Sequence, residues 1–286
     1  MDRAGKQTPT PDHGEGIFSM GHARRWSWVL VLLVGAVLFE IVRRSIVSTG
    51  NPNLVPSLIL LGAAVVPAAF VVFIAGRRLV FEASGGTVAL TALIGGVIGV
   101  VTAGLLEYST LRRLGTLPMT GVGLIEEFAK LLVPALLFLV VRRHLHPADG
   151  LLLGVASGAG FAILETMGYA FVVLLQSKGN LGVVDNVLFV RGILSPAAHM
   201  AWTGIAAAAL WDAGAHRWKG AAGARFVGAF LVVVGLHTAW DALGSTVVYV
   251  VLSVVSLVLL ARVSHHLAAP HRREDVVLRP VAPAGR

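Results

Sequence analysis

Long apolar stretches separated by short polar segments dominate this chain. Each is about 20 residues long, the length of helix needed to cross the hydrocarbon core of a bilayer. Strands of a membrane barrel would instead be about ten residues long and alternate in polarity. The eight stretches are residues 26–42, 54–75, 87–106, 121–141, 150–175, 187–210, 224–243 and 246–263. The pattern predicts an all-α fold: a polytopic transmembrane helical bundle of about eight spans, with no soluble domain.

The polar ends of the chain complete the predicted domain organisation. Residues 1–25 contain prolines and glycines and are not followed by a small-residue cleavage site, so we expect a polar tail before a membrane anchor. Residues 26–263 form the transmembrane domain. Residues 264–286 are basic and contain proline, which predicts a C-terminal tail next to the membrane.

The basic residues predict the orientation in the membrane. If both termini lie on one side, that side carries sixteen Lys and Arg residues and the other carries six. The positive-inside rule then places both termini in the cytoplasm of a multi-pass protein of the cell membrane. The net charge of +8 therefore reflects topology, and we expect no nucleic-acid partner.

Composition narrows the available chemistry. The chain is 56% hydrophobic and 13% charged, and it contains no cysteine. Disulfides, thiolate metal ligands and a cysteine nucleophile are therefore excluded, which leaves histidines and carboxylates as side-chain ligands for a metal. Gly150, Gly154 and Gly158 recur at a spacing of four, a pattern that allows another helix to approach closely and that is most simply explained by packing.

Ionisable residues inside the apolar stretches are the most informative feature. A charge near the bilayer centre costs roughly 2.5 to 3.5 kcal/mol on insertion scales, so such residues pair, line a wet cavity or serve a function. Glu126, Glu127 and Lys130 lie in one stretch. Glu126 and Lys130 are one helical turn apart and can pair, whereas Glu127 points about 100° away. An interhelical polar clamp is the alternative to a functional site.

Further polar residues lie in the three following stretches. Glu165 has no cation one turn away on its own helix, so it is either neutral in the core or paired with another helix. His199 and His237 are each followed by a tryptophan three residues later. Asp241, four residues after His237, could orient its ring, and the two histidines with nearby carboxylates favour metal ligation over buried core histidines.

These residues form an ordered set of motifs that resembles a known family. The motifs are Glu126-Glu127-Phe128-Ala129-Lys130, Phe161 to Glu165, Arg191 with Ser195-Pro196-Ala197-Ala198-His199, and His237-Thr238-Ala239-Trp240-Asp241. The set resembles the PrsW family of intramembrane proteases, which is distantly similar to the CAAX-prenyl proteases and their bacteriocin-immunity relatives. The resemblance covers a motif core of residues 121–243.

The resemblance implies an intramembrane peptidase, of metallopeptidase or glutamic type, that cuts single-pass or other membrane proteins in the bilayer. In the metal version His199 and His237 are ligands with Glu165 as the third, and zinc is the default metal. Glu126 or Glu127 is then the base, and Lys130 holds the charge of its neighbour. In the metal-free version a glutamate activates water and the histidines stabilise the oxyanion.

The depth of the polar residues predicts where cleavage occurs. At 1.5 Å per residue, Glu126 lies roughly 8 Å from the non-cytoplasmic end of its span, so we expect cleavage near that face. Two other functions use the same residues: a proton-coupled carrier, and a nonenzymatic membrane scaffold. A carrier predicts an inverted repeat, of which only the two His-x-x-Trp segments are present, and a scaffold predicts a missing acid or histidine.

Overall fold

The structure, a computed structural model, describes residues 20–77, 79–140 and 146–277, and within these ranges it is helical without any strand. The α-helices are α1 (Met20–Thr49), α2 (Val55–Ala75), α3 (Gly85–Leu114), α4 (Met119–Val140), α5 (Pro147–Gln176), α6 (Leu181–Leu194), α7 (His199–Ala215), α8 (Ala222–Leu243) and α9 (Thr246–Val277). Two short 3-10 helices, η1 (Pro52–Leu54) and η2 (Ser195–Ala197), precede α2 and α7. The fold is an all-α polytopic bundle, as predicted.

Six segments of the described chain are long and apolar enough to cross a membrane. They are Pro52–Ala75, Gly85–Leu114, Pro147–Gln176, Leu181–Ala215, Ala222–Leu243 and Thr246–Ala268. The two other stretches predicted as spans correspond to α1 and α4. α4 is 22 residues long but carries Glu126, Glu127 and Lys130 near its middle, and these charges lower its apolar character. The chain is thus a multi-pass membrane protein.

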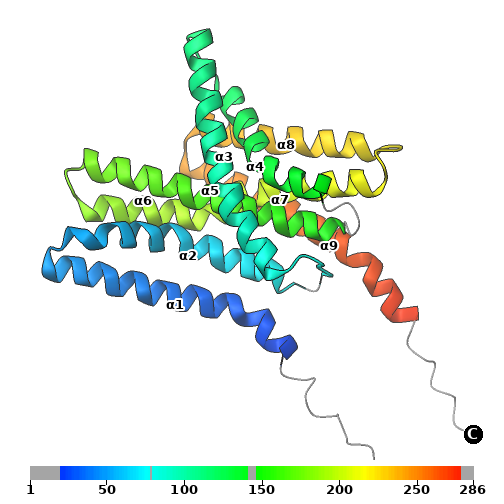
Figure 1. Cartoon of the computed structure of the whole chain (residues 1–286), viewed down its shortest axis with the longest axis horizontal. Coiled ribbons are helices and arrows are strands. Elements are labelled where there is room, and N and C mark those ends of the chain that lie inside the picture. Colours follow the sequence, from blue (N-terminus) through cyan, green and yellow to red (C-terminus); the bar gives the residue numbers. More distant parts are fainter. Residues whose placement is uncertain (1–19, 78, 141–145, 278–286) are drawn as a thin grey trace, which may run out of the picture.

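The packing of the bundle is organised around α5. This helix contacts α7 and α3 most extensively and also α2, α6 and α4. In Figure 1, α1, α2, α5 and α6 run side by side, while α3 and α4 cross them and project beyond the other helices. The core of the bundle therefore lies along α5 and α7, where nearly every residue from Ala148 to Ala162 is buried.

Glycines on α5 allow α7 to approach closely. A methyl group at Gly150 or Gly154 would lie 2.8 or 2.5 Å from the carbonyl oxygen of Ala207 or Thr203. At Gly158 it would collide with the carbonyl oxygen of His199. The three glycines of α5 are four residues apart, and they meet residues of α7 that are four apart in the opposite order. This close packing holds His199, the first residue of α7, against α5.

The segment predicted as one span over residues 187–210 is broken. α6 ends at Leu194, η2 follows, and α7 begins at His199. Pro196 lies at the start of η2, and Ala198 adopts φ −107° and ψ −112°, which is outside the helical region. The break places His199 at the start of a helix rather than in its middle.

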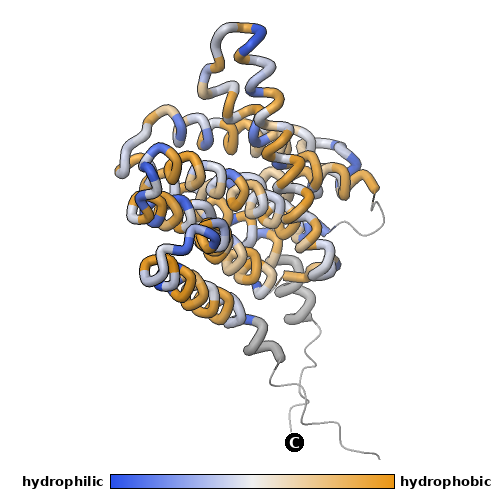
Figure 2. Tube along the Cα trace, turned by 60° about the vertical axis from the view of Figure 1, so that its left-hand side comes forward, coloured by the Kyte–Doolittle hydropathy of each residue, from blue (hydrophilic) through white to orange (hydrophobic). Residues whose placement is uncertain are grey.

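Large apolar side chains cover much of the outside of the bundle. Exposed examples include Leu33 on α1, Leu93 on α3, Phe189 on α6 and Val247 on α9, all at least 59% exposed. Figure 2 shows that apolar residues make up most of the length of the helices. This apolar surface is far larger than the apolar patches that soluble proteins expose to water. It is therefore suited to contact with lipid.

The chain ends differ in part from the predicted tails. α1 already begins at Met20, and residues 1–19 lie outside the described part of the chain. α9 continues to Val277, so residues 264–277 of the predicted C-terminal tail are helical.

Candidate active site

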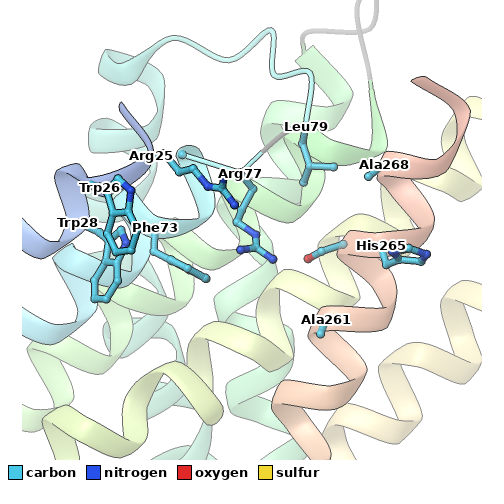
Figure 3. A pocket seen from close by; sticks show the side chains of 11 residues that line it. Arg25, Trp26, Trp28, Phe73, Arg77, Leu79, Ala261, His265 and Ala268 are labelled. Atoms are coloured by element: carbon cyan, nitrogen blue, oxygen red, sulfur yellow. The ribbon is translucent and has the colours of Figure 1, made fainter. Parts of the chain in front are cut away.

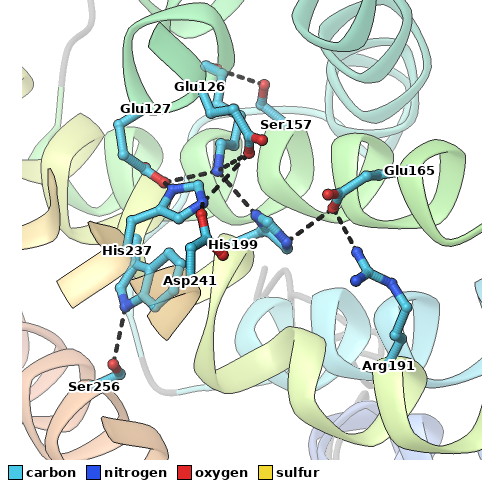
Figure 4. A network of polar contacts seen from close by, with 11 residues as sticks. Glu126, Glu127, Ser157, Glu165, Arg191, His199, His237, Asp241 and Ser256 are labelled. Atoms are coloured by element: carbon cyan, nitrogen blue, oxygen red, sulfur yellow. Dashed lines mark hydrogen bonds and ion pairs between the residues drawn. The ribbon is translucent and has the colours of Figure 1, made fainter. Parts of the chain in front are cut away.

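Three charged residues of α4 form the centre of a buried polar cluster. Glu127 and Lys130 are completely buried, and the Glu126 side chain is 11% exposed. Because Lys130 lies three residues after Glu127 and four after Glu126 on one helix, its side chain can reach both carboxylates. The polar side chains around these three residues come from α5, α7 and α8 (Figure 4).

Lys130 is the cation of this cluster. Its Nζ donates to Glu127 Oε1 at 2.7 Å and lies 3.4 Å from Glu126 Oε2. It also donates to Nδ1 of His199 at 2.9 Å. The ammonium lies 4.7 Å from the centre of the Phe161 ring, so one face of the cation is covered by an aromatic side chain.

His237 is held by a carboxylate at each nitrogen. Its Nδ1 donates to Glu127 Oε1 at 2.8 Å. Its Nε2 lies 3.5 Å from Glu126 Oε2 and 3.3 Å from Asp241 Oδ2. The bond from Nδ1 to Glu127 fixes the tautomer and directs Nε2 toward Glu126.

His199 has an equivalent arrangement on the other side of the cluster. Its Nε2 lies 3.0 Å from Glu165 Oε2, and the same carboxylate oxygen lies 2.7 Å from Nη2 of Arg191. Its Nδ1 accepts from Lys130 and faces the interior of the cluster. The rings of His199 and His237 are 5.6 Å apart, centre to centre.

The two histidines therefore follow one rule. Each has an outer nitrogen held by a carboxylate that is itself paired with a cation: Glu127 with Lys130, and Glu165 with Arg191. The other nitrogen of each ring, Nδ1 of His199 and Nε2 of His237, is its inner nitrogen and faces the region around Glu126. Glu126 differs from the other two glutamates because its contacts with Lys130 and His237 are 3.4 and 3.5 Å long, whereas the contacts of Glu127 and Glu165 are 2.7 to 3.0 Å long.

Aromatic packing fixes the position of the His237 ring. The Trp202 ring stacks on the His237 ring with centres 5.0 Å apart. The indole Nε1 of Trp202 donates to Ser256 Oγ at 2.9 Å, and Ser256 is completely buried. α9, which carries none of the ionisable residues of the cluster, thus supports the site through this hydrogen bond.

The structure brings together most of the residues singled out from the sequence. Glu126, Glu127, Lys130, His199 and His237 contact one another directly, and Glu165 joins through the outer nitrogen of His199. The sequence analysis did not foresee that Arg191 pairs with Glu165 or that Ser256 holds Trp202. A lone serine in an otherwise apolar stretch is the signal that could have indicated the second of these partners.

One group of side chains in the described part of the chain has the geometry to hold a metal ion. Ligand atoms of Glu126, His199 and His237 all lie within 4.8 Å of one another. Two imidazoles and one carboxylate are a donor set found in catalytic zinc sites, so the residues present fit such an ion. The carboxylate in this group is Glu126, whereas the sequence analysis expected Glu165.

The comparisons with known proteins agree with this cluster. The profile of the family described as PrsW family intramembrane metalloprotease matches residues 83–263, which is more than half of the chain and includes every residue of the cluster. No curated protein and no solved structure matches the chain.

Proposed function

We propose a catalytic centre for this chain, which belongs to the PrsW family of intramembrane metalloproteases. As a member of that family it is an intramembrane peptidase that acts on proteins in the lipid bilayer. The proposal is that peptide hydrolysis takes place at Glu126 and at the inner nitrogens of His199 and His237. The observation that carries it is the convergence of these three side chains from α4, α7 and α8.

The three converging residues are the ones that would hold a metal ion. A bound divalent ion would polarise the peptide carbonyl and lower the pKa of an attacking water. His237 would bind through Nε2, because its Nδ1 proton is held by Glu127. The metal is expected to be zinc, since the chain has no thiolate and the set of two imidazoles and one carboxylate suits that ion.

Glu127 and Glu165 position the histidines rather than attack the substrate. Glu127 is completely buried, and one oxygen is shared between Lys130 and His237. Glu165 contacts both Arg191 and His199. A carboxylate that holds the outer nitrogen of a histidine orients the ring and makes its other nitrogen a better ligand. Our proposal therefore moves Glu165 from the ligands to this supporting role.

One contact favours a metal-free version of the same reaction. The Lys130 ammonium donates to Nδ1 of His199, the nitrogen that faces Glu126. A cation already present between the acid and the histidine can stabilise the oxyanion of a tetrahedral intermediate. In this version Glu126 takes the proton of the attacking water, and the Lys130 ammonium donates to the oxyanion.

The orientation and the place of cleavage are part of the proposal. Both termini are assigned to the cytoplasm by the distribution of basic residues. With that orientation Glu126, in the first half of α4, lies in the outer half of the membrane, so a membrane protein substrate is cut near the non-cytoplasmic face. The exposure of the Glu126 side chain, although only 11%, supports access of water to it.

The proposal is tested by measuring cleavage of single-pass membrane proteins in proteoliposomes, together with the metal content of the same samples. We expect His237→Ala to abolish cleavage. His216→Ala is the matched control, since His216 is an exposed histidine beyond the end of α7. Metal present in the wild type and lost in His237→Ala supports the metal version. Full cleavage by the His237→Ala protein would show that this cluster takes no part in the reaction.

A further inference from the structure

A polar cavity lies at the opposite end of the bundle from the α3–α4 projection and takes no part in the cluster described above. It is about 350 Å³ in volume and is enclosed by the start of α1, the end of α2 and the middle of α9 (Figure 3). Its lining includes Arg25, Trp28, Phe73, Arg77 and His265. Two arginines and a histidine line it, and no described acidic residue does.

The two arginines of this cavity have no carboxylate partner among the described residues. The guanidinium of Arg77 lies 4.9 Å from the centre of the Phe73 ring, and both arginines are exposed. In Figure 3 the side chains of Arg25 and Arg77 extend into the same space between α2 and α9. Two guanidinium groups without a local counterion form a site for an anion, and their planar donors match the oxygens of a phosphate.

An apolar groove continues from this basic cavity. It has a volume of about 260 Å³ and shares Trp28 and Phe73 with the cavity. The remaining lining residues are Leu32, Val66, Ala69, Phe70 and Pro196. Along α1 the order is Arg25, Trp28, Leu32, so the lining changes from basic through aromatic to apolar over roughly 10 Å of helix. α2 and the residues that follow it show the same order in reverse, from Val66 through Phe73 to Arg77.

This succession of surfaces matches a phospholipid. A phosphate-bearing headgroup needs basic donors at the membrane surface, tryptophans favour the interface, and an acyl chain needs an apolar groove below them. We propose that the cavity binds an anionic phospholipid, with its phosphate between Arg25 and Arg77 and an acyl chain in the groove. A free phosphate ion would share the headgroup contacts but would leave the groove unused.

The bound lipid would connect parts of the bundle that are far apart in the sequence. The cavity is lined by both the first and the last helix, and the groove reaches Pro196 in η2. Pro196 lies three residues before His199, the residue that begins α7. An acyl chain in the groove therefore contacts the turn that places His199 in the catalytic cluster.

The test is a titration of the purified full-length protein with phosphatidylglycerol, followed by native mass spectrometry, with phosphatidylcholine as the neutral lipid. The variant Arg25→Gln/Arg77→Gln should bind phosphatidylglycerol roughly 30-fold more weakly than the wild type, because each basic residue near the surface contributes a factor of about five. The variant Arg25→Lys/Arg77→Lys should bind within a few-fold of the wild type, because it keeps both charges.

A matched control removes the same charge elsewhere. Arg217→Gln/Lys219→Gln changes two exposed basic residues of the α7–α8 connection, which do not line the cavity. It should leave phosphatidylglycerol binding unchanged. Equal weakening in the control and in Arg25→Gln/Arg77→Gln would overturn the proposal, as would unchanged binding in both.

Two further measurements separate a lipid from a free ion and from misfolding. Inorganic phosphate should fail to displace the lipid, and displacement by it would show that the site holds phosphate alone. Val66→Trp fills the apolar groove and should weaken phosphatidylglycerol binding with both arginines in place, whereas full binding in that variant would exclude the groove from the site. Circular dichroism of each variant confirms that the helices are retained.

Discussion

Replacing Lys130 by methionine tests whether the buried cluster depends on one cation. Methionine is similar in length and apolar, so it fills the same space without the charge. Lys130 is completely buried and holds Glu127 at 2.7 Å. Without the ammonium, the Glu127 carboxylate stays buried with only the bond from His237. Breaking a buried pair by removing one partner costs about 3 to 5 kcal/mol, so we expect a loss of that size in the free energy of unfolding.

The double variant Lys130→Met/Glu127→Gln tests this prediction more strictly. Glutamine keeps an oxygen that can accept from His237 Nδ1, and the pair is now neutral. Replacing both members of a buried ion pair is often close to neutral in stability. The double variant should therefore be more stable than Lys130→Met by about 2 kcal/mol or more, although it carries one more substitution.

The measurement is unfolding of the purified protein by sodium dodecyl sulfate in mixed micelles, followed by circular dichroism. Wild type, both single variants and the double variant form a cycle that isolates the pairwise energy. We expect Lys130→Met to be the least stable of the four. If the double variant lost the sum of the two single losses, Lys130 and Glu127 would act independently and our description of the cluster would be incorrect.

Three further predictions follow from the packing and the topology. Gly160→Ala should destabilise the protein by about 1 to 3 kcal/mol, because the new methyl group would collide with a backbone carbonyl of α3. Gly168→Ala on the same helix should not destabilise it, because a methyl group there meets nothing within 4 Å. Unfolding in mixed micelles measures both variants. Ser256→Ala should cost about 1 to 3 kcal/mol in the same assay, because it leaves the buried Trp202 Nε1 without an acceptor. Ser109→Cys, on the exposed surface of α3, should be labelled by an impermeant maleimide from the non-cytoplasmic side; labelling from the cytoplasm alone would reverse the assigned orientation.

The sequence predicted the helical class and most members of the cluster, because both depend on properties of single helices. Apolar length predicts a span, and a charge within a span is unfavourable unless it has a partner. The sequence could therefore single out Glu126, Glu127 and Lys130 before any partner was known.

The partners across helices could not be predicted in the same way, because they depend on tertiary packing. Arg191 on α6 pairs with Glu165 on α5, a contact that depends on how these two helices pack. The break between α6 and α7 was missed because the apolar character of residues 187–210 is continuous, although Pro196 is a local signal for it. The choice between Glu126 and Glu165 as the carboxylate nearest both inner nitrogens likewise required the geometry.

The central claim is that Glu126 carries the reaction, and the most direct test is the cleavage rate of Glu126→Gln. Glutamine keeps the size of the side chain and removes its charge, so the fold should be retained. Glu40→Gln is the control: it removes a carboxylate that pairs with Arg43 and Arg44 on α1. Both variants and the wild type are compared on one membrane protein substrate in proteoliposomes free of host proteases. We predict that Glu126→Gln lowers the rate by at least about 100-fold while Glu40→Gln cleaves as the wild type does, and cleavage by Glu126→Gln at the wild-type rate would contradict the account.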